Sequence, residues 1–199
     1  MFSLLPAVTR ALLIANGIGF VLQLYLGEGF TERFALQPLG SLFAPYQVVT
    51  YAFLHGSFSH LFFNMLAVFM FGGPLEQLWG QRRFLVFYFA SVLGAAAAQL
   101  IVTKMTGTPY YTVGASGGVF GLLFAFALNF PRQRIILLFP PIPMPAWLFV
   151  TLYGIAELAF GLTNTLPGIA HFAHLGGLFG GALVILFWRL QGAPTARPF

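Results

Sequence analysis

Three short segments of an otherwise apolar sequence carry the residue types that acyl-transfer chemistry needs. His60 and Asn64 are four residues apart, and Ser116 stands among glycines. His174 precedes a second run of glycines. A serine hydroxyl attacks a carbonyl when an imidazole removes its proton, and nearby N–H groups stabilise the oxyanion that forms. The sequence therefore contains a candidate nucleophile, a candidate base and candidate oxyanion donors.

Each segment also has a purely structural explanation. His60 and Asn64 share one helix face, where they could form an interhelical hydrogen-bond pair. The segment Gly114-Ala-Ser116-Gly-Gly118 is typical of places where membrane helices cross closely. His174 could be bonded to a neighbouring helix without any catalytic role. For each segment taken alone, the structural and the catalytic interpretations both stay open.

The glycines after His174 indicate which histidine reaches the serine. Gly177 and Gly181 are four residues apart, so they form a smooth helix face that permits close approach of another helix. His174 lies one turn before Gly177 on this face, whereas His171 lies a further turn away with no glycines in register. The segment that begins at Ser116 is the expected partner, so we expect His174 to reach that hydroxyl.

The acidic residues limit the possible chemistry. The chain has no aspartate and no cysteine, which excludes a Ser-His-Asp triad, disulfides and thiolate catalysis. Serine catalysis must then use a Ser-His dyad or recruit a glutamate. We expect neither a metal nor a cofactor. The acids are Glu28, Glu32, Glu76 and Glu157.

Two of the glutamates call for partners. Glu76 is close in sequence to Arg82 and Arg83, and we expect it to form a structural ion pair there. Glu157 lies inside an apolar segment, where an unpaired carboxylate is costly. We expect it to be protonated or bonded to Tyr153, one turn before, and to lie too deep in the membrane to reach the level of the serine.

The composition indicates an integral membrane protein. Of the 199 residues 59% are hydrophobic and 7% are charged, whereas a soluble domain carries roughly a quarter charged residues. Such a chain cannot cover a water-facing surface, so we expect the lipid bilayer to contact most of it. The net charge of +5 does not indicate nucleic-acid binding, because the nine Lys and Arg residues form no basic patch.

Apolar segments of about 20 residues, broken at charges, prolines and glycines, predict six membrane-spanning helices in one all-α domain over residues 1–199. Residues 30–51 contain Pro38, Gly40 and Pro45, so they are expected to form a long loop at the membrane interface. Residues 191–199 are expected to form a short cytoplasmic tail. The predicted spans are 7–26, 60–79, 84–103, 115–130, 146–162 and 169–190.

The positive charges predict the orientation. Under this topology only Arg33 and Lys104 fall on one side of the membrane, and the other seven fall on the opposite side. By the positive-inside rule both termini are cytoplasmic. The candidate site then opens on the outer side of a membrane that we expect to be a bacterial inner membrane. The seven are Arg10, Arg82, Arg83, Arg132, Arg134, Arg189 and Arg197.

This topology changes the balance between the structural and the catalytic interpretations. The serine, the histidine and the His/Asn pair all lie toward the outer ends of different spans. Independent structural accidents would rarely place a nucleophile, a base and oxyanion donors at one depth, so the joint pattern favours acyl transfer.

At this point the sequence resembles the rhomboid family of intramembrane serine proteases. The motifs cover nearly the whole chain, in family order and at family spacing, and the resemblance implies a compact six-span bundle of the bacterial type. The matching segments are His60-x-x-x-Asn64, Gly114-Ala-Ser116-Gly, Ala173-His174-x-x-Gly177-x-x-x-Gly181, Phe53-Leu-His55 and Phe71-Gly-Gly-Pro-Leu-Glu76-Gln-Leu-Trp-Gly80.

The resemblance implies hydrolysis of peptide bonds in transmembrane protein substrates by a Ser-His dyad. Ser116 would be the nucleophile, and His174 the general base and then the acid for the leaving amine. His60, Asn64 and the backbone N–H of Ser116 would form the oxyanion hole, which Gly114 would shape. Substrate identity and oligomeric state are left open.

Other residues receive supporting roles from the resemblance. His55 would organise structure or water near the oxyanion site, with His171 as further support. Phe120 stands where many members have a tyrosine that stacks on the catalytic imidazole. Tyr46-Gln47 replaces a common Trp-Arg pair, so the first loop lacks an arginine anchor. Glu157 lies in the fifth span, which moves to admit substrate in this family, and is a candidate for tuning that gate.

Two other functions remain as alternatives. A rhomboid-like pseudoenzyme would bind client helices without cleaving them, but inactive relatives usually lack the serine or the histidine, and both are present here. A channel or transporter would use the buried histidines, but the six predicted spans show no internal repeat of the transporter kind.

Overall fold

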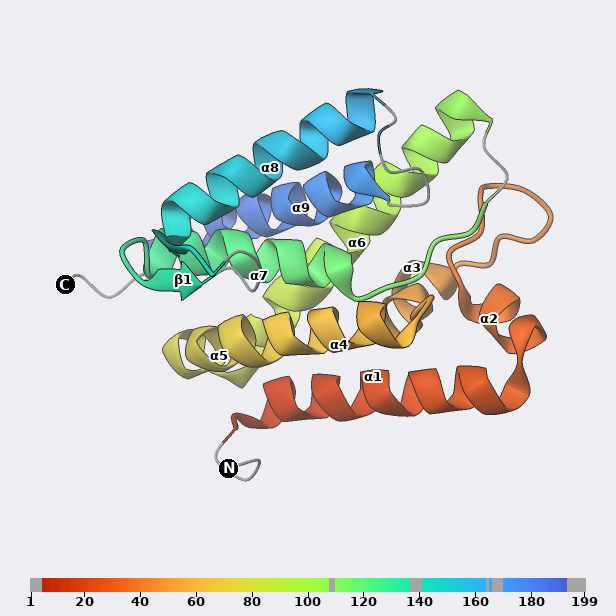
Figure 1. The fold of residues 1–199 in the computed structure, drawn as a ribbon, viewed down its shortest axis with the longest axis horizontal. Coiled ribbons are helices and arrows are strands. Elements are labelled where there is room, and N and C mark those ends of the chain that lie inside the picture. The colour runs from red at the N-terminus through yellow and green to blue at the C-terminus, as the bar shows by residue number, and fades with distance from the viewer. Residues whose placement is uncertain (1–4, 108–109, 137–140, 164, 166–169, 193–199) are drawn as a thin grey trace.

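The computed structural model describes residues 5–107, 110–136, 141–163, 165 and 170–192, and it is a helical bundle (Figure 1). A short antiparallel hairpin of β1 and β2 forms the one sheet among these residues. The elements are α1 (Ala7–Leu26), α2 (Glu28–Phe34), α3 (Gln47–Thr50), the 3-10 turn η2 (Tyr51–Phe53), α4 (Phe58–Ala67), the π-helical turn η3 (Val68–Gly72), α5 (Gly73–Trp79), α6 (Gln81–Thr106), α7 (Ser116–Asn129), β1 (Arg134–Ile136), β2 (Pro143–Pro145), α8 (Ala146–Thr163) and α9 (His171–Leu190).

The prediction of a helical polytopic membrane bundle is confirmed. Five continuous helical segments are long and apolar enough to cross a membrane: α1, α4 through α5, α6, α8 and α9. The fourth predicted span corresponds to α7, which is apolar but has only 14 residues. The predicted start of the last span at residue 169 and the tail beyond residue 192 fall outside the described residues.

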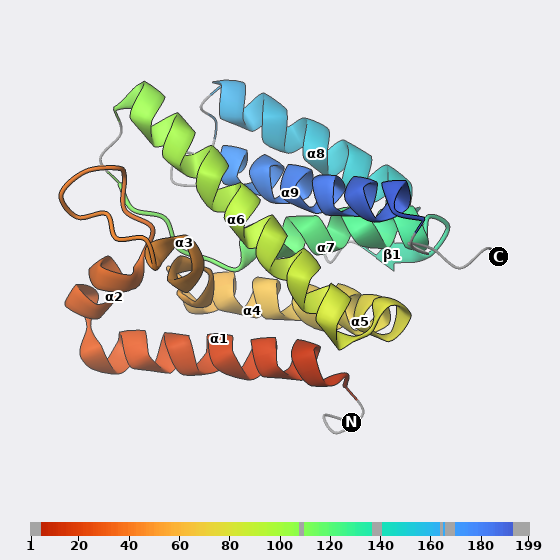
Figure 2. The same ribbon diagram turned by 180° about the vertical axis from the view of Figure 1, so that it is seen from behind.

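The short helix α7 occupies the centre of the bundle. It lies between the α4–α5 segment and the pair α8 and α9, while α6 crosses the bundle diagonally (Figures 1 and 2). Most of its side chains are buried. At 1.5 Å per residue it is about 21 Å long, about 9 Å less than the hydrocarbon core of a bilayer. Because its last residues reach the same end of the bundle as α5, its first residue lies in the interior (Figure 1).

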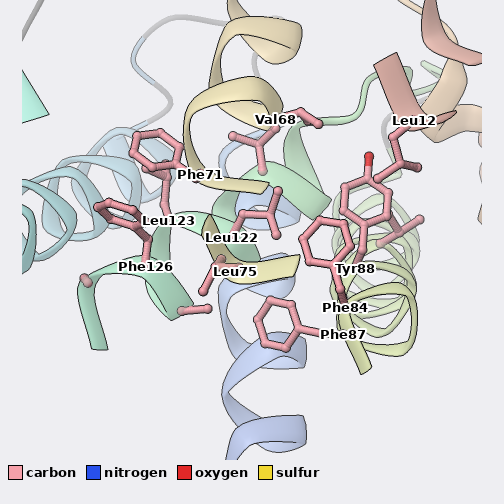
Figure 3. Packing of buried hydrophobic residues seen from close by; sticks show 14 of the residues in the cluster. Leu12, Val68, Phe71, Leu75, Phe84, Phe87, Tyr88, Leu122, Leu123 and Phe126 are labelled. Atoms are coloured by element: carbon pink, nitrogen blue, oxygen red, sulfur yellow. The ribbon is translucent and has the colours of Figure 1, made fainter. Parts of the chain in front are cut away.

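Aromatic and branched side chains fill the space around α7. Phe71 of η3 packs edge-to-face on Phe126 of α7, with ring centroids 5.0 Å apart. Figure 3 shows both rings in the same buried cluster, together with Leu122 of α7 and residues of α5 and α6. These contacts hold α7 from the side of α4 and α5.

Glycines bring α9 against two helices at once. A Cβ on Gly177 would overlap the carbonyl oxygen of Gly117, so the backbones of α9 and α7 touch there. A Cβ on Gly94 would lie 2.6 Å from the carbonyl oxygen of Gly176, so α6 also meets α9 at backbone distance. Gly181 faces α6, where a Cβ would lie 2.7 Å from the ring of Phe87. The two glycines of the predicted smooth face therefore contact different partners.

A π-helical turn interrupts the second span just before Pro74. Proline has no N–H to donate and its ring clashes with the preceding turn of a regular α-helix. The wider turn Val68–Gly72 lets the segment continue into α5 in spite of the proline. The bulge leaves Gly72 packed on the side chain of Thr9 in α1, to which its Cβ would come within 3.2 Å.

The expected ion pair of Glu76 with Arg82 or Arg83 is wrong. The Glu76 carboxylate instead accepts hydrogen bonds from the backbone N–H groups of Val8 (2.9 Å) and Thr9 (2.7 Å). It also accepts one from the Thr9 hydroxyl, at 2.8 Å. The first N–H groups of a helix have no intrahelical partner and attract negative charge. The Glu76 carboxylate of α5 therefore caps the start of the neighbouring helix α1.

The loop after α1 is organised by Gln47, although the loop lacks an arginine anchor as predicted. Its side chain is 1% exposed. Its amide nitrogen donates to the carbonyl oxygens of Arg33 and Leu42, each at 3.1 Å. Its amide oxygen accepts from the N–H groups of Gln37 (3.3 Å) and Ala44 (3.1 Å). A neutral side chain thus closes the loop without bringing a charge toward the membrane.

Candidate active site

The side chains of Ser116 and His174 are in direct contact. His174 Nε2 lies 2.9 Å from Ser116 Oγ. Ser116 is the first residue of α7 and His174 lies in the first turn of α9. Gly117 directly follows Ser116 and Gly177 lies one turn after His174, so the close approach of these two glycines sets the distance between the two side chains. A ring nitrogen at this distance can accept the hydroxyl proton.

The chain before Ser116 is held in an extended path that ends at a constrained glycine. Leu36 and Thr112 exchange two backbone hydrogen bonds of 3.0 Å. The N–H of Gly114 then donates to the carbonyl oxygen of Tyr51, at 2.9 Å. Gly114 has a φ of +133°, which side-chain-bearing residues rarely adopt. The turn at Gly114 therefore aims the start of α7 at the site.

Tyr111 ties this extended segment to α2. Its hydroxyl donates to the carboxylate of Glu28, the first residue of α2. The hydrogen bond to Glu28, with smaller effects of burial and of the negative charge, raises the pKa of Tyr111 to about 12. The tyrosine therefore stays protonated as a donor over the physiological pH range.

Unpaired backbone N–H groups surround the serine. The first intrahelical bond at this end of α7 runs from the N–H of Val119 to the carbonyl oxygen of Ala115. The N–H groups of residues 116–118 therefore have no carbonyl partner within the helix. Together with the positive end of the helix dipole, they can stabilise an anionic oxygen beside Ser116.

The position of His60 favours a donor role for its outer ring nitrogen. Ser57 caps α4 by accepting a hydrogen bond from the N–H of His60, at 3.1 Å. The N–H of Gly56 points at His60 Nδ1, 3.4 Å away, so Nδ1 is the acceptor and Nε2 carries the proton. A Cβ on Gly114 would lie 2.9 Å from that Nε2. The missing side chain of Gly114 thus lets His60 approach Ser116.

Asn64 lies one turn below His60 and lines the same cavity as Ser116. Its amide nitrogen donates to the carbonyl oxygen of His60, at 2.9 Å, which uses one of its two N–H bonds. The second N–H remains for a ligand in the cavity.

His55 packs behind His60 and not against the serine. Its ring is 2% exposed and its centroid lies 5.0 Å from that of His60, at 70°. Its backbone N–H donates to Gln23 Oε1, at 2.8 Å, which joins the loop to α1. Burial, with a smaller contribution from His60, lowers the pKa of His55 to about 3. His55 is therefore neutral at physiological pH and supports the ring of His60.

Phe120 lies against His174. Its ring stacks on the imidazole of His174 with centroids 4.4 Å apart and planes 9° from parallel. The ring of Phe120 also packs on Tyr153 of α8, with ring centroids 4.9 Å apart. The aromatic face fixes the plane of the imidazole, and phenylalanine supplies it without a hydroxyl.

One cavity of about 730 Å³ is lined by Ser116, His60, Asn64, Phe120 and His174. Its wall is formed by α4 and η3, by residues 110–113, by α7 and by facing residues of α8 and α9. This volume lies within the range of about 300–1,000 Å³ that is typical of ligand-binding pockets.

Glu157 contacts His174, contrary to the prediction that it lies too deep in the membrane to reach the level of the serine. Glu157 Oε2 lies 2.7 Å from His171 Nδ1 and 3.0 Å from His174 Nδ1. No hydrogen bond joins it to Tyr153, the predicted partner, among those described. Glu157 precedes the end of α8 by about 9 Å and His174 follows the start of α9 by about 5 Å. Because α7 begins in the interior, these two levels and that of Ser116 coincide.

Comparison with known proteins finds similar sequences along most of the chain. Residues 43–190 match the family model described as the rhomboid domain. The chain is 31% identical over 156 residues to Rhomboid protein 1, mitochondrial, of Saccharomyces cerevisiae, which covers 77% of this chain and 45% of that protein. It is 28% identical over 199 residues to Rhomboid-like protein 11, chloroplastic, of Arabidopsis thaliana, covering 92% and 68%.

A bacterial relative has a similar sequence identity to this chain, but the match covers a smaller part of the relative's length. The chain is 30% identical over 154 residues to Rhomboid protease GluP of Bacillus subtilis, which covers 77% of this chain and 27% of that protein. The chain spans about half the length of the yeast relative and about a quarter of GluP.

Proposed function

The chain belongs to the rhomboid family, and on this premise we propose that it is an intramembrane serine endopeptidase in which Ser116 is the nucleophile and His174 the general base. The observation that carries the proposal is the 2.9 Å contact between His174 Nε2 and Ser116 Oγ inside a membrane bundle. The substrates are membrane proteins whose transmembrane segments enter the cavity beside α7.

In the first half of the reaction, His174 Nε2 takes the proton of Ser116 as Oγ attacks the carbonyl carbon of the scissile bond. The carbonyl oxygen becomes an oxyanion within reach of the N–H groups at the start of α7. His60 Nε2–H and the second N–H of Asn64 add side-chain donors from α4. These N–H donors favour the reaction because they stabilise the negative charge of the oxyanion, which develops in the transition state and is absent from the substrate.

In the second half, His174 gives its proton to the leaving amine as the carbon–nitrogen bond breaks. An ester between Ser116 and the new carboxyl end remains. Water loses a proton to His174 Nε2 as its oxygen attacks this ester, and the proton returns to Ser116 Oγ when the acid leaves. Each step uses the same imidazole, so its plane and its tautomer must be controlled throughout.

Access of water and substrate follows from the length of α7. Because α7 begins about 9 Å below the level of a full span, the cavity above Ser116 can open to the aqueous phase. A substrate helix must unwind locally before its carbonyl is free, since helical carbonyls are hydrogen-bonded. We expect cleavage near Gly, Pro or other helix-weakening residues, close to the outward-facing surface of the membrane that contains the protein.

The test is cleavage of tagged transmembrane segments by the purified protein in detergent. Ser116→Ala and His174→Ala are each expected to reduce the rate by about 10⁴-fold or more. Wild-type protein is expected to react with a fluorophosphonate probe, and both variants to lose that reaction. Cleavage that survives in Ser116→Ala would remove the proposal, and binding of client helices without cleavage by wild type would favour a pseudoenzyme.

A further inference from the structure

We propose that Glu157 is a positioning residue for the general base: its carboxylate keeps the ring proton of His174 on Nδ1, and His171 balances its charge. The inference rests on the proposed roles of Ser116 and His174. It adds a third member to the predicted dyad, supplied by a glutamate of α8 instead of the missing aspartate.

The carboxylate lies at the back of the base. His174 Nε2 faces Ser116 Oγ at 2.9 Å, and the opposite ring nitrogen, Nδ1, faces Glu157 Oε2 at 3.0 Å. This contact has an ion-pair distance but falls short of full hydrogen-bond geometry, and Nδ1 has no other polar partner among the described residues. The carboxylate oxygen is therefore the acceptor within reach of an Nδ1 proton among the described residues.

The contact of Glu157 Oε2 with His171 determines how many protons Glu157 and His171 share. His171 Nε2 lies 3.0 Å from the carbonyl oxygen of Thr165. A carbonyl only accepts, so Nε2 of His171 carries a proton. His171 Nδ1 lies 2.7 Å from Glu157 Oε2, and two bare acceptors would repel each other at that distance. One further proton therefore lies between Glu157 and His171.

Either location of that proton leaves His174 ready to act as a base. If it is on His171, the carboxylate accepts from both Nδ1–H groups and the pair of Glu157 and His171 is neutral overall. If it is on Glu157, the acid donates to His171 Nδ1 and still accepts from His174 Nδ1–H. In both cases Nε2 of His174 has a free lone pair facing Ser116.

Burial explains why the Glu157 carboxylate contacts both His171 and His174. Glu157 is 4% exposed and His171 is 6% exposed. A buried carboxylate in a membrane protein is costly unless it is paired, and the two imidazoles are the partners that the structure provides. Because Glu157 belongs to α8 and both histidines belong to α9, the orientation of the base also depends on how α8 lies against α9.

Glu157→Gln is the decisive substitution because it preserves shape and removes the charge. An amide NH₂ at the position of Oε2 donates to both Nδ1 atoms, so the ring proton of His174 moves to Nε2. There it blocks proton transfer from Ser116. We expect kcat to fall by about 100-fold, less than the roughly 10⁴-fold loss when the aspartate of a serine-protease triad becomes an amide, with KM almost unchanged.

Two further variants separate positioning from folding. Glu157→Asp keeps the acceptor on a shorter side chain and is expected to retain at least about a tenth of wild-type kcat. Glu32→Gln makes the same chemical change at an exposed residue of α2 and is expected to leave kcat unchanged. Thermal unfolding of all variants identifies any that do not fold.

The closing measurement is nitrogen NMR of ¹⁵N-labelled histidine side chains, with His174 assigned by its absence in His174→Gln. We expect the Nδ1–H tautomer in wild type and the Nε2–H tautomer in Glu157→Gln, in parallel with the loss of kcat. An unchanged tautomer and unchanged kcat in folded Glu157→Gln would overturn the inference. If wild type neither cleaves substrate nor reacts with fluorophosphonate, the proposed function fails, while the tautomer comparison still decides the role of Glu157.

Discussion

Histidines at four positions of this chain differ in what surrounds their ring nitrogens. His174 lies between a serine and a carboxylate, and His171 between the same carboxylate and a carbonyl. His60 accepts from a backbone N–H and turns its other nitrogen toward the cavity. His55 has no hydrogen-bond partner for either ring nitrogen within the described residues. Residue type alone therefore does not fix a role, and the partners of each nitrogen do.

The low pKa of His55 predicts a specific loss of stability in acid. The folded-state value of about 3 lies below the ordinary value of 6.5, so between these limits the unfolded state binds a proton that the folded state does not. Stability therefore falls as the pH falls below 6.5, by about 2 kcal/mol between pH 7 and pH 5 from this group alone.

His55→Phe tests this expectation because it keeps an aromatic ring beside His60. Free energies of unfolding in mixed micelles at pH 7 and pH 5 measure the effect. The variant is expected to lose about 2 kcal/mol less than wild type over this range. The other histidines are present in both proteins and cancel, so an identical pH dependence in the two would show that His55 is not the responsible group.

At the scale of helices, the site depends on glycines that hold α9 against α7 and α6. The backbone contact of Gly177 with Gly117 lies next to the serine–histidine contact, because Gly117 directly follows Ser116 and Gly177 lies one turn after His174. A side chain at this crossing displaces His174 directly, because α9 carries that residue. The crossing thus sets the geometry of the proposed catalytic pair, although no glycine there is proposed to take part in the chemistry.

Gly177→Ala is expected to destabilise the protein and to impair catalysis together. The added Cβ overlaps a backbone oxygen of α7, so α9 must shift, at a cost of about 1–3 kcal/mol. Cleavage rate and free energy of unfolding are measured on the same samples. Gly17→Ala in α1 is the matched control, since its Cβ has nothing within 4 Å and helix propensity favours alanine by up to about 1 kcal/mol. Equal behaviour of the two variants would contradict the argument.

At the scale of the whole molecule, basic residues gather at one end of the bundle. The start of α1, the start of α6, β1 and the end of α9 lie at this end (Figure 1). They carry Arg10, Arg83, Arg134 and Arg189. Lys104 lies in the last turn of α6, at the opposite end. These arginines therefore group at one end of the fold, as the sequence-based topology predicts. The cavity lies toward the end with fewer positive charges.

Reporter fusions test the orientation that we propose, with both ends of the chain in the cytoplasm. A reporter active only in the cytoplasm is expected to work at either end of the chain. A reporter active only outside is expected to work when fused at Gly107, after α6. The reverse pattern in a bacterial host would contradict the orientation, and with it the proposal that the cavity opens on the outer side.

The sequence by itself determined the membrane class, the approximate spans and the groups that could form the site. Apolar segments of sufficient length must be helices in lipid, because every backbone group needs an internal partner. Glycines at i and i+4 identify a close helix contact, and that spacing favoured His174 over His171. These inferences rest on local periodicity, which the sequence carries directly.

Only the tertiary structure decided the partners of Glu76, Gln47 and Glu157. Glu76 caps a helix 67 residues away in sequence, and Glu157 reaches two histidines on the next helix. Such contacts depend on the relative depth and rotation of whole helices, which local periodicity does not specify. The short α7 begins inside the bundle, and that depth brings the carboxylate of α8 level with His174, the proposed base.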